Sequence, residues 1–347
     1  MTAKRTVTAR RLGFFSRLLD QTDAASRYRL ATEQIVTAER LGFDSAWVAQ
    51  HHFFEDEGGL PSPFVLLAHL AAHTSTIRLG TGIVTLALEN PLRVAEDAAV
   101  FDLLSDRRLE LGVGSGGNPQ AFPPFGQVNA DRTGVYVENL KAMRAALRGD
   151  GLGGDARLYP AGPQLLDRIW QATFSVEGGR RAGLDGDGLM LSRTQPRPAN
   201  APKATLSEMQ EPIIDAYLAA LPAGRTPRIT GSRTLFVTDN RDEARRYADA
   251  GLRRHEARMQ GLGRGLTGET LDELIASTDS YVGTVEEVLE ALRHDPTLDR
   301  VTDLVFQVHS IDPPHALILR SLELIAAKVA PALGWHQSPA RHLEAAQ

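Results

Sequence analysis

The chain of 347 residues contains no cysteine. This absence excludes disulfide bonds, thiolate catalysis and cysteine zinc sites, and it fits a reducing compartment, so we expect a cytoplasmic protein. Basic residues are not in excess either, because 38 Lys and Arg stand against 43 Asp and Glu, for a formal net charge of -5. Nothing therefore attracts the protein to nucleic acid or to an anionic membrane. No stretch is apolar for long enough to cross a bilayer, and the basic N-terminus lacks the apolar run of a signal peptide.

Short apolar segments alternate with helical patterns along the whole chain. This alternation is typical of parallel strands joined by right-handed helical crossovers. About eight strands favour a closed (β/α)8 TIM barrel over an open doubly wound sheet, and we expect one α/β domain over residues 1–347. The expected strands are 12–15, 43–48, 77–86, 109–113, 168–172, 189–191, 230–237 and 301–308, and the expected helices are 28–41, 64–73, 91–104, 136–147, 177–182, 241–259, 285–292 and 315–329.

Three segments break the alternation. Residues 119–130 are rich in proline, residues 194–206 have weak patterning, and residues 260–280 are polar and glycine-rich. Long irregular insertions in a compact domain are commonly lids or binding loops, so we expect all three to be mobile. Residues 260–280 are the candidate lid.

Two histidines, His51 and His52, follow the second predicted strand, and aromatic residues follow them. In a barrel, chemistry collects at the C-terminal ends of the strands. Histidine can donate, accept or shuttle a proton near neutral pH. The residues alone leave two interpretations open, namely the edge of a catalytic cleft or two side chains that bind backbone in a turn.

A glycine-rich loop, Gly112-Val113-Gly114-Ser115-Gly116-Gly117, follows the fourth strand. Its spacing matches the G-x-G-x-x-G motif of dinucleotide-binding folds. That motif needs a helix to open at once, whereas Asn118 and Pro119 follow here. We therefore expect glycines that let the backbone approach a flat ligand, with a simple tight turn as the alternative.

Ser175 opens a helix after the fifth strand. N–H groups at the start of a helix bind phosphate well, and Arg180 or Arg181 could add positive charge. The alternative is that Ser175 only caps the helix.

Two other polar groups carry weaker signals. His69 and His73 are one helical turn apart, a spacing that can hold a metal, but neither has the glutamate of the H-E-x-x-H motif and no third ligand is evident. We expect both to face solvent or to pack at the helix end, and we predict no metal site. The acidic run at residues 55–57 is expected to be a solvated loop.

Several segments, in order, resemble the bacterial luciferase-like flavin monooxygenases. The match is strongest from Ala38 to Gly117, where it includes Trp47 and the His51-His52-Phe53 segment, and it extends over nearly the whole chain. The matching segments are residues 38–53, 77–82, 90–97, 103–114, 169–170 before Ser175, 186–188 and 282–288. The chain departs from the family at Phe174, where the bacterial luciferases carry a glutamate.

The resemblance implies a monooxygenase that takes reduced FMN as a co-substrate from a separate flavin reductase. Dioxygen would add to the flavin to give a hydroperoxide, which would oxidise a small organic substrate such as an aldehyde or ketone. His51 would be the catalytic residue beside the flavin ring. Thr81 and Gly82 would lie against the ring, where the family often has a non-proline cis peptide, Gly114 and Ser115 would line the ribityl chain, and Ser175, Val176, Glu177 and Gly178 would hold the phosphate.

Two alternatives within this resemblance are a deazaflavin-dependent oxidoreductase of the same superfamily and a flavin-binding protein without turnover. Barrels of this family often pair through helices near the second and third strands. Residues 64–72 are apolar enough to take part, so we expect a homodimer.

Overall fold

The computed structural model describes residues 10–128, 131–198, 200–261 and 268–335. Its parallel strands form one ten-stranded sheet, and eight of them close into a ring when β10 pairs with both β8 and β1. The ring consists of β1 (Arg11–Ser16), β2 (Ser45–Val48), β3 (Arg78–Thr81), β5 (Leu109–Gly114), β6 (Ile169–Ala172), β7 (Gly188–Leu191), β8 (Ile229–Val237) and β10 (Asp303–Gln307). The predicted (β/α)8 barrel is confirmed.

Two short strands lie outside the ring. β4 (Val84–Thr85) continues the third strand region beside β5, and β9 (Ser280–Gly283) pairs with the second half of β8. The ring strands are buried on both faces, as expected for parallel strands covered by helices.

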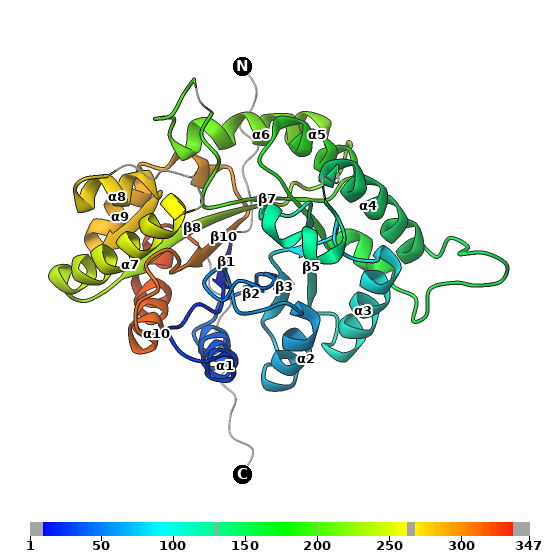
Figure 1. Cartoon of the computed structure of the whole chain (residues 1–347), viewed down its shortest axis with the longest axis horizontal. Helices are drawn as coiled ribbons and strands as arrows, with labels where there is room; N and C mark the ends of the chain where they lie inside the picture. The colour runs from blue at the N-terminus through cyan, green and yellow to red at the C-terminus, as the bar shows by residue number, and fades with distance from the viewer. Residues whose placement is uncertain (1–9, 129–130, 199, 262–267, 336–347) are drawn as a thin grey trace, which may run out of the picture.

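Helices surround the ring of strands, as Figure 1 shows. α3 occupies the residues expected from its pattern, because Asn90 accepts hydrogen bonds from the first N–H groups and Pro91 suits the first turn. The helices are α1 (Ala24–Arg40), α2 (Pro63–His73), α3 (Pro91–Leu104), α4 (Arg132–Arg148), α5 (Val176–Leu184), α6 (Leu206–Ala220), α7 (Arg241–Gly261), α8 (Leu271–Ser277), α9 (Val285–Arg293), α10 (His315–Leu324) and α11 (Ala330–Ala332), with shorter turns η1 (Pro119–Ala121), η2 (Pro123–Phe125), η3 (Pro163–Arg168), η4 (Pro296–Asp299) and η5 (Ile325–Val329).

Three elements, α6, α8 and β9, differ from expectation. α6 contains Pro212 and starts at a capping box between Thr205 and Glu208. α8 and the start of β9 lie within residues 260–280, so an irregular segment is the wrong prediction for that part of the candidate lid. Leu274 of α8 is fully buried in a small core beside β8, and this contact stabilises the helix. Residues 262–267 of the lid, 129–130 of the first insertion and 199 of the second lie outside the described residues.

A separate apolar cluster of Trp47, Trp170, Met190 and Val305 packs between the strands. The two indoles meet edge to face, with ring centroids 5.8 Å apart. Glycine is needed beside each indole, because a Cβ atom at Gly80 or Gly188 would lie 2.3 or 2.2 Å from its ring. Among the described residues, no helix combines the length and apolar character needed to cross a membrane.

Candidate functional site

The predicted site residues lie at the same edge of the barrel, on four neighbouring strands. β2, β3, β5 and β6 follow one another in the sheet, and the residues in question stand at or just after their C-terminal ends. We call this set the β2–β6 arc: His51, Thr81, Gly82, Gly114, Ser115 and Ser175–Gly178. A TIM barrel carries its binding groups at this edge.

His51 is held by its loop. Its N–H donates to the Leu60 carbonyl at 2.9 Å, and its ring packs on Gly58, where a Cβ atom would come within 2.5 Å of the imidazole. Gln50 fixes the loop from the other side, because its side chain accepts from the Thr85 N–H at 2.7 Å and donates to Glu89 Oε1 at 2.7 Å. Sequence reasoning missed Gln50, since an amide beside two histidines carries no signal by itself.

Burial lowers the pKa of His51 well below its usual range, and the charges of Arg17 and Arg258 lower it further. The nearest carboxylate oxygen is Glu57 Oε2, 3.9 Å from His51 Nδ1. His51 is therefore neutral at neutral pH. A neutral imidazole presents one donor and one acceptor nitrogen, so it can hold or pass a single proton.

Glu57 is buried, with 8% of its surface exposed, so the solvated loop predicted at residues 55–57 is wrong for this residue. Its carboxylate accepts hydrogen bonds from Asn118 and from Arg258 Nη2, the latter at 2.5 Å. Its carbonyl accepts from Arg17 Nη2 at 2.5 Å. These partners come from distant parts of the chain, which is why the local sequence gave no sign of them.

The side chain of Thr81 is held within the sheet. It is completely buried, and its Oγ1 donates to the Gly112 carbonyl at 2.7 Å and accepts from the Gly112 N–H at 2.9 Å. The hydroxyl ties β3 to β5. The peptide bond between Gly82 and Ile83 is cis, one residue beyond the pair expected at the ring. Gly82 and Ser115 are partly exposed, whereas Gly114 is buried against Ile83.

Ser175 caps α5. Its Oγ accepts from the Gly178 N–H at 3.1 Å, while Thr173 Oγ1 accepts from the Ser175 N–H at 3.1 Å. The cap leaves the N–H groups of Val176 and Glu177 without an intrahelical partner, and both residues are exposed.

The two arginines proposed to bind phosphate at α5 already contact other side chains. Arg180 pairs with the Glu177 carboxylate at 2.7 and 2.9 Å. Arg181 donates to Gln171 at 3.2 Å and lies over the Tyr136 ring. Any anion at the start of α5 would therefore rely mainly on backbone N–H groups.

An open cleft of about 880 Å³ lies beside the start of α5. Phe174 and Val176 form one wall, and Gln195, Met209 and Ile213 belong to the opposite segments. Phe174 is 51% exposed, so the residue that departs from the family pattern contributes an apolar surface to this cleft.

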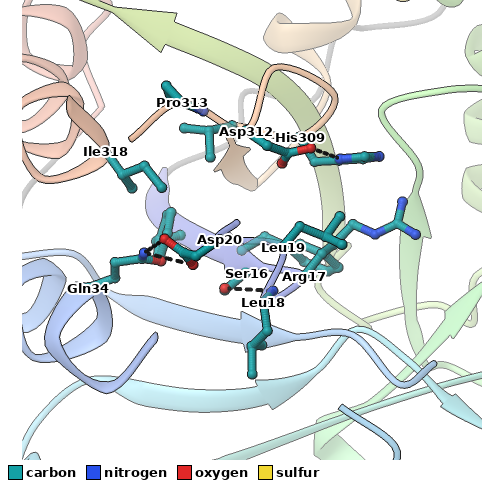
Figure 2. Close-up of a pocket in the computed structure, with 13 residues that line it drawn as sticks. Ser16, Arg17, Leu18, Leu19, Asp20, Gln34, His309, Asp312, Pro313 and Ile318 are labelled. Carbon is teal, nitrogen blue, oxygen red and sulfur yellow. Dashed lines mark hydrogen bonds and ion pairs between the residues drawn. The ribbon is translucent and has the colours of Figure 1, made fainter. Parts of the chain in front are cut away.

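The other half of the barrel edge carries polar residues that sequence reasoning missed. We call them the β7–β1 arc: Arg17, Arg193, Thr234, His309 and Asp312. Thr234 lies within β8, and the others follow the ends of β1, β7 and β10. His309 Nδ1 lies 2.7 Å from Asp312 Oδ2, and Thr234 Oγ1 donates to the His309 carbonyl at 2.6 Å. A cavity of about 20 Å³, which is room for one water molecule, is lined by Arg17, His309 and Asp312 among other residues. Figure 2 shows the side chains that line it.

The remaining motifs do not form sites in the described residues. β5 ends at Gly114 and the next α-helix begins only at Arg132, so the glycine loop is not a dinucleotide-binding turn. His69 and His73 are exposed on α2, with ring centroids 4.2 Å apart. No group of three or more possible metal ligands occurs in the part of the chain that the structure describes.

Comparisons with known proteins identify the family of the chain. The family model described as luciferase-like monooxygenase matches residues 12–297. The chain is 29% identical to 4-hydroxyprotoasukamycin monooxygenase of Streptomyces nodosus subsp. asukaensis over 74% of this chain and 73% of that protein. It is 26% identical to limonene 1,2-monooxygenase of Rhodococcus erythropolis over 86% of this chain and 80% of that protein.

Solved structures share the fold. Monooxygenase RslO1 from Streptomyces bottropensis matches 93% of this chain and 99% of its own, with a TM-score of 0.76 and 24% identity. The oxygenating constituent of 3,6-diketocamphane monooxygenase of Pseudomonas putida, in complex with FMN, matches 93% of this chain and 98% of its own (TM-score 0.68, 20% identity). A coenzyme F420 dependent reductase of Methanopyrus kandleri matches 93% of this chain and 99% of its own (TM-score 0.67, 20% identity). The expected enzyme class, a flavin-dependent monooxygenase, is confirmed by the family match, and the chain belongs to the luciferase-like monooxygenase family.

Proposed function

We propose that the protein uses reduced FMN and dioxygen to oxidise a small organic substrate such as an aldehyde or ketone. One observation carries the proposal. A neutral histidine, a glycine-lined strand edge and a capped helix start occur in this order on adjacent strands of the β2–β6 arc. A flavin mononucleotide needs a partner for its ring, room for its ribityl chain and donors for its phosphate.

The donors of the arc fit FMN. The free N–H groups of Val176 and Glu177, at the positive end of α5, suit a phosphate. Gly82 and Ser115 are partly exposed at the strand ends, where small residues would let a flat ring system approach the backbone. Bound reduced FMN would supply the electrons and the position at which dioxygen is activated.

The chain contributes a positioned proton carrier and an aromatic cluster beside it. His51 is neutral and fixed between Gly58 and Leu60, so it can hold a proton at one ring nitrogen close to the reacting centre. Next to it, His52 contacts Phe125 with ring centroids 5.0 Å apart, and Phe53 contacts the same ring at 5.3 Å. This aromatic cluster would limit access of water to His51, which oxygen chemistry on a flavin requires.

A separate flavin reductase would supply the reduced FMN. The glycine loop after β5 lacks the helix that a dinucleotide site needs. We therefore assign reduction of the flavin by a nicotinamide cofactor to another protein.

We also propose a homodimer that pairs through α2 and α3. Five large apolar side chains are exposed on these helices: Val65 at 73%, Leu104 at 69%, Leu103 at 46%, Val100 at 44% and Leu92 at 37%. A monomer rarely leaves such a patch uncovered. Light scattering should give twice the mass of the chain, and replacement of Val65 and Leu104 by Glu should give the monomer.

Anaerobic titration tests the cofactor. We expect reduced FMN to bind and coenzyme F420 not to compete with it. If F420 binds and FMN does not, the deazaflavin-dependent alternative is correct. A flavin that purifies tightly bound and resists both reduction and exchange would instead identify a binding protein without turnover.

Mixing the reduced FMN complex with oxygen tests catalysis. We expect oxidised FMN to reappear more slowly than from free reduced FMN, and His51→Ala to remove the delay. His294→Ala, at an exposed histidine, is the control and should keep it. The same time course for wild type and His51→Ala would contradict the role of His51.

A further inference from the structure

Two arginines of the β7–β1 arc have no carboxylate within ion-pair distance among the described residues. Arg193 is 5% exposed, and its side chain makes one hydrogen bond there, from Nη1 to Thr234 Oγ1 at 3.2 Å. Arg17 donates from Nη2 to the Glu57 carbonyl at 2.5 Å, and its Nε is buried without a partner. A guanidinium has five N–H donors, so most of this hydrogen-bonding capacity is unused.

Other buried arginines in the described chain are satisfied. Arg233 bonds Asp295 at 2.6 Å and Gln210 at 3.1 Å. Arg108 has no ion pair, yet it donates five hydrogen bonds to carbonyl and hydroxyl oxygens. Arg17 and Arg193 therefore differ from the structural arginines of the same protein.

The β7–β1 arc holds more positive than negative side chains. Burial lowers the pKa of Arg17 to about 10 and that of Arg193 to about 9, and the charge of Arg17 adds to the effect on Arg193. The charge of Asp312 acts on both arginines, and burial raises the pKa of Asp312 to about 6. Glu57 acts in addition on Arg17, and Asp279 acts on Arg193. Asp312 is hydrogen bonded to His309. None of these carboxylates forms an ion pair with Arg17 or Arg193 among the described residues, so an anion placed between the two guanidinium groups would relieve their repulsion.

Further polar atoms in the arc are unpartnered. His309 is 5% exposed, and its Nε2 has no hydrogen bond, although Nδ1 is fixed by Asp312. Ser310 Oγ is also buried without a partner. Figure 2 shows Arg17 and His309 extending to the same side, away from Asp20 and Gln34. Buried polar atoms without partners are uncommon in native proteins. Here several lie close together, where a ligand can supply the missing hydrogen-bond partners.

We infer that the β7–β1 arc is an anion subsite in which Arg17 and Arg193 bind a carboxylate group of the substrate. The inference rests on the proposed function, because it names the substrate class of that enzyme. The flavin phosphate is assigned to the start of α5 after β6, on the other half of the barrel edge. A carboxylate can accept two parallel hydrogen bonds from the planar guanidinium group of an arginine, and it fits that group better than a neutral oxygen does.

Calorimetric titration of the full chain with straight-chain carboxylates from acetate to octanoate, each paired with its primary amide, tests the subsite. Each pair has the same shape and differs in charge. We expect at least one carboxylate to bind about tenfold or more tightly than its amide. Arg193→Gln and Arg17→Gln should each remove this preference.

Arg320→Gln is the control, because it removes the same charge from an exposed arginine on α10 that pairs with Asp239. It should leave the preference unchanged. Equal binding of every carboxylate and its amide, or a preference that survives Arg193→Gln, would overturn the inference. Reduced FMN titrated into the same variants separates the two proposals. Unchanged FMN affinity with lost carboxylate binding supports the subsite, and failure of FMN to bind wild type refutes only the proposed function.

Discussion

The imidazole of His51 lies directly against Gly58. A Cβ atom at residue 58 would come within 2.5 Å of His51 Cδ2 and 2.9 Å of Cγ. Cγ lies at the root of the ring, so the side chain cannot avoid the clash by a small rotation. Glycine at this position therefore sets where the histidine stands.

Gly58→Ala should displace His51 without removing it. We expect the delay in reappearance of oxidised FMN to shorten about tenfold or more, since a small misplacement of a catalytic group is costly. Gly117→Ala is the matched control, because no atom lies within 4 Å of a Cβ atom there. Stopped-flow absorbance measures both variants. Equal delays in the two would mean that the position of His51 does not matter.

Ser175→Ala should weaken binding of reduced FMN. The substitution removes the cap of α5 and costs about 1 kcal/mol of stability. Thr205→Ala removes the comparable cap of α6, where Thr205 Oγ1 accepts from the Glu208 N–H at 3.2 Å, and it should cost a similar amount. Anaerobic titration should show weaker binding for Ser175→Ala and unchanged binding for Thr205→Ala. If both variants bind reduced FMN equally, the phosphate does not lie at α5.

Arg193→Met should stabilise the protein. A buried guanidinium without a carboxylate partner costs free energy, and an apolar side chain of similar length avoids that cost, so we expect the free energy of unfolding to rise by about 1–3 kcal/mol. Arg233→Met is the contrast, because Arg233 is equally buried but paired with Asp295. It should lower the free energy of unfolding by about 3–5 kcal/mol. Denaturant unfolding measures both, and a large loss for Arg193→Met would indicate a structural role instead of a binding one.

Stability should fall in acid because of His255. Burial lowers its pKa to about 2, and the charges of His309 and Arg193 contribute. Below pH of about 6.5 the unfolded chain binds a proton that the folded protein does not, so each pH unit of acidification costs up to about 1.4 kcal/mol for this residue. His255→Phe should reduce the slope of unfolding free energy against pH by that amount between roughly pH 6 and 4. The exposed substitution His294→Phe should leave the slope unchanged, and an unchanged slope in His255→Phe would contradict burial of a neutral imidazole.

Most of the barrel could be predicted from local pattern. α3 starts and ends at the predicted residues, because Asn90-Pro91 is a strong start signal and the apolar spacing is regular. α6 was missed because Pro212 interrupts its pattern, and tertiary contacts of Ile213 and Ile214, both buried, decide its conformation.

The two halves of the barrel edge differ in how far the sequence predicts them. The β2–β6 arc was identified because each of its pieces is a contiguous segment with its own signal. Glu57, Arg17 and Arg193 belong to arrangements that only the closed ring of strands creates, since their partners are distant in sequence. The hydrogen bond from the Thr81 hydroxyl to the Gly112 carbonyl could not be predicted, because it joins two strands that are distant in sequence.

A crystal structure of the protein with FMN tests the central claim most directly. We expect the phosphate within hydrogen-bond distance of the Val176 and Glu177 N–H groups, and the flavin ring beside His51. A phosphate bound between Arg17 and Arg193 would contradict it, because the flavin would then occupy the half of the barrel edge that we assign to the substrate.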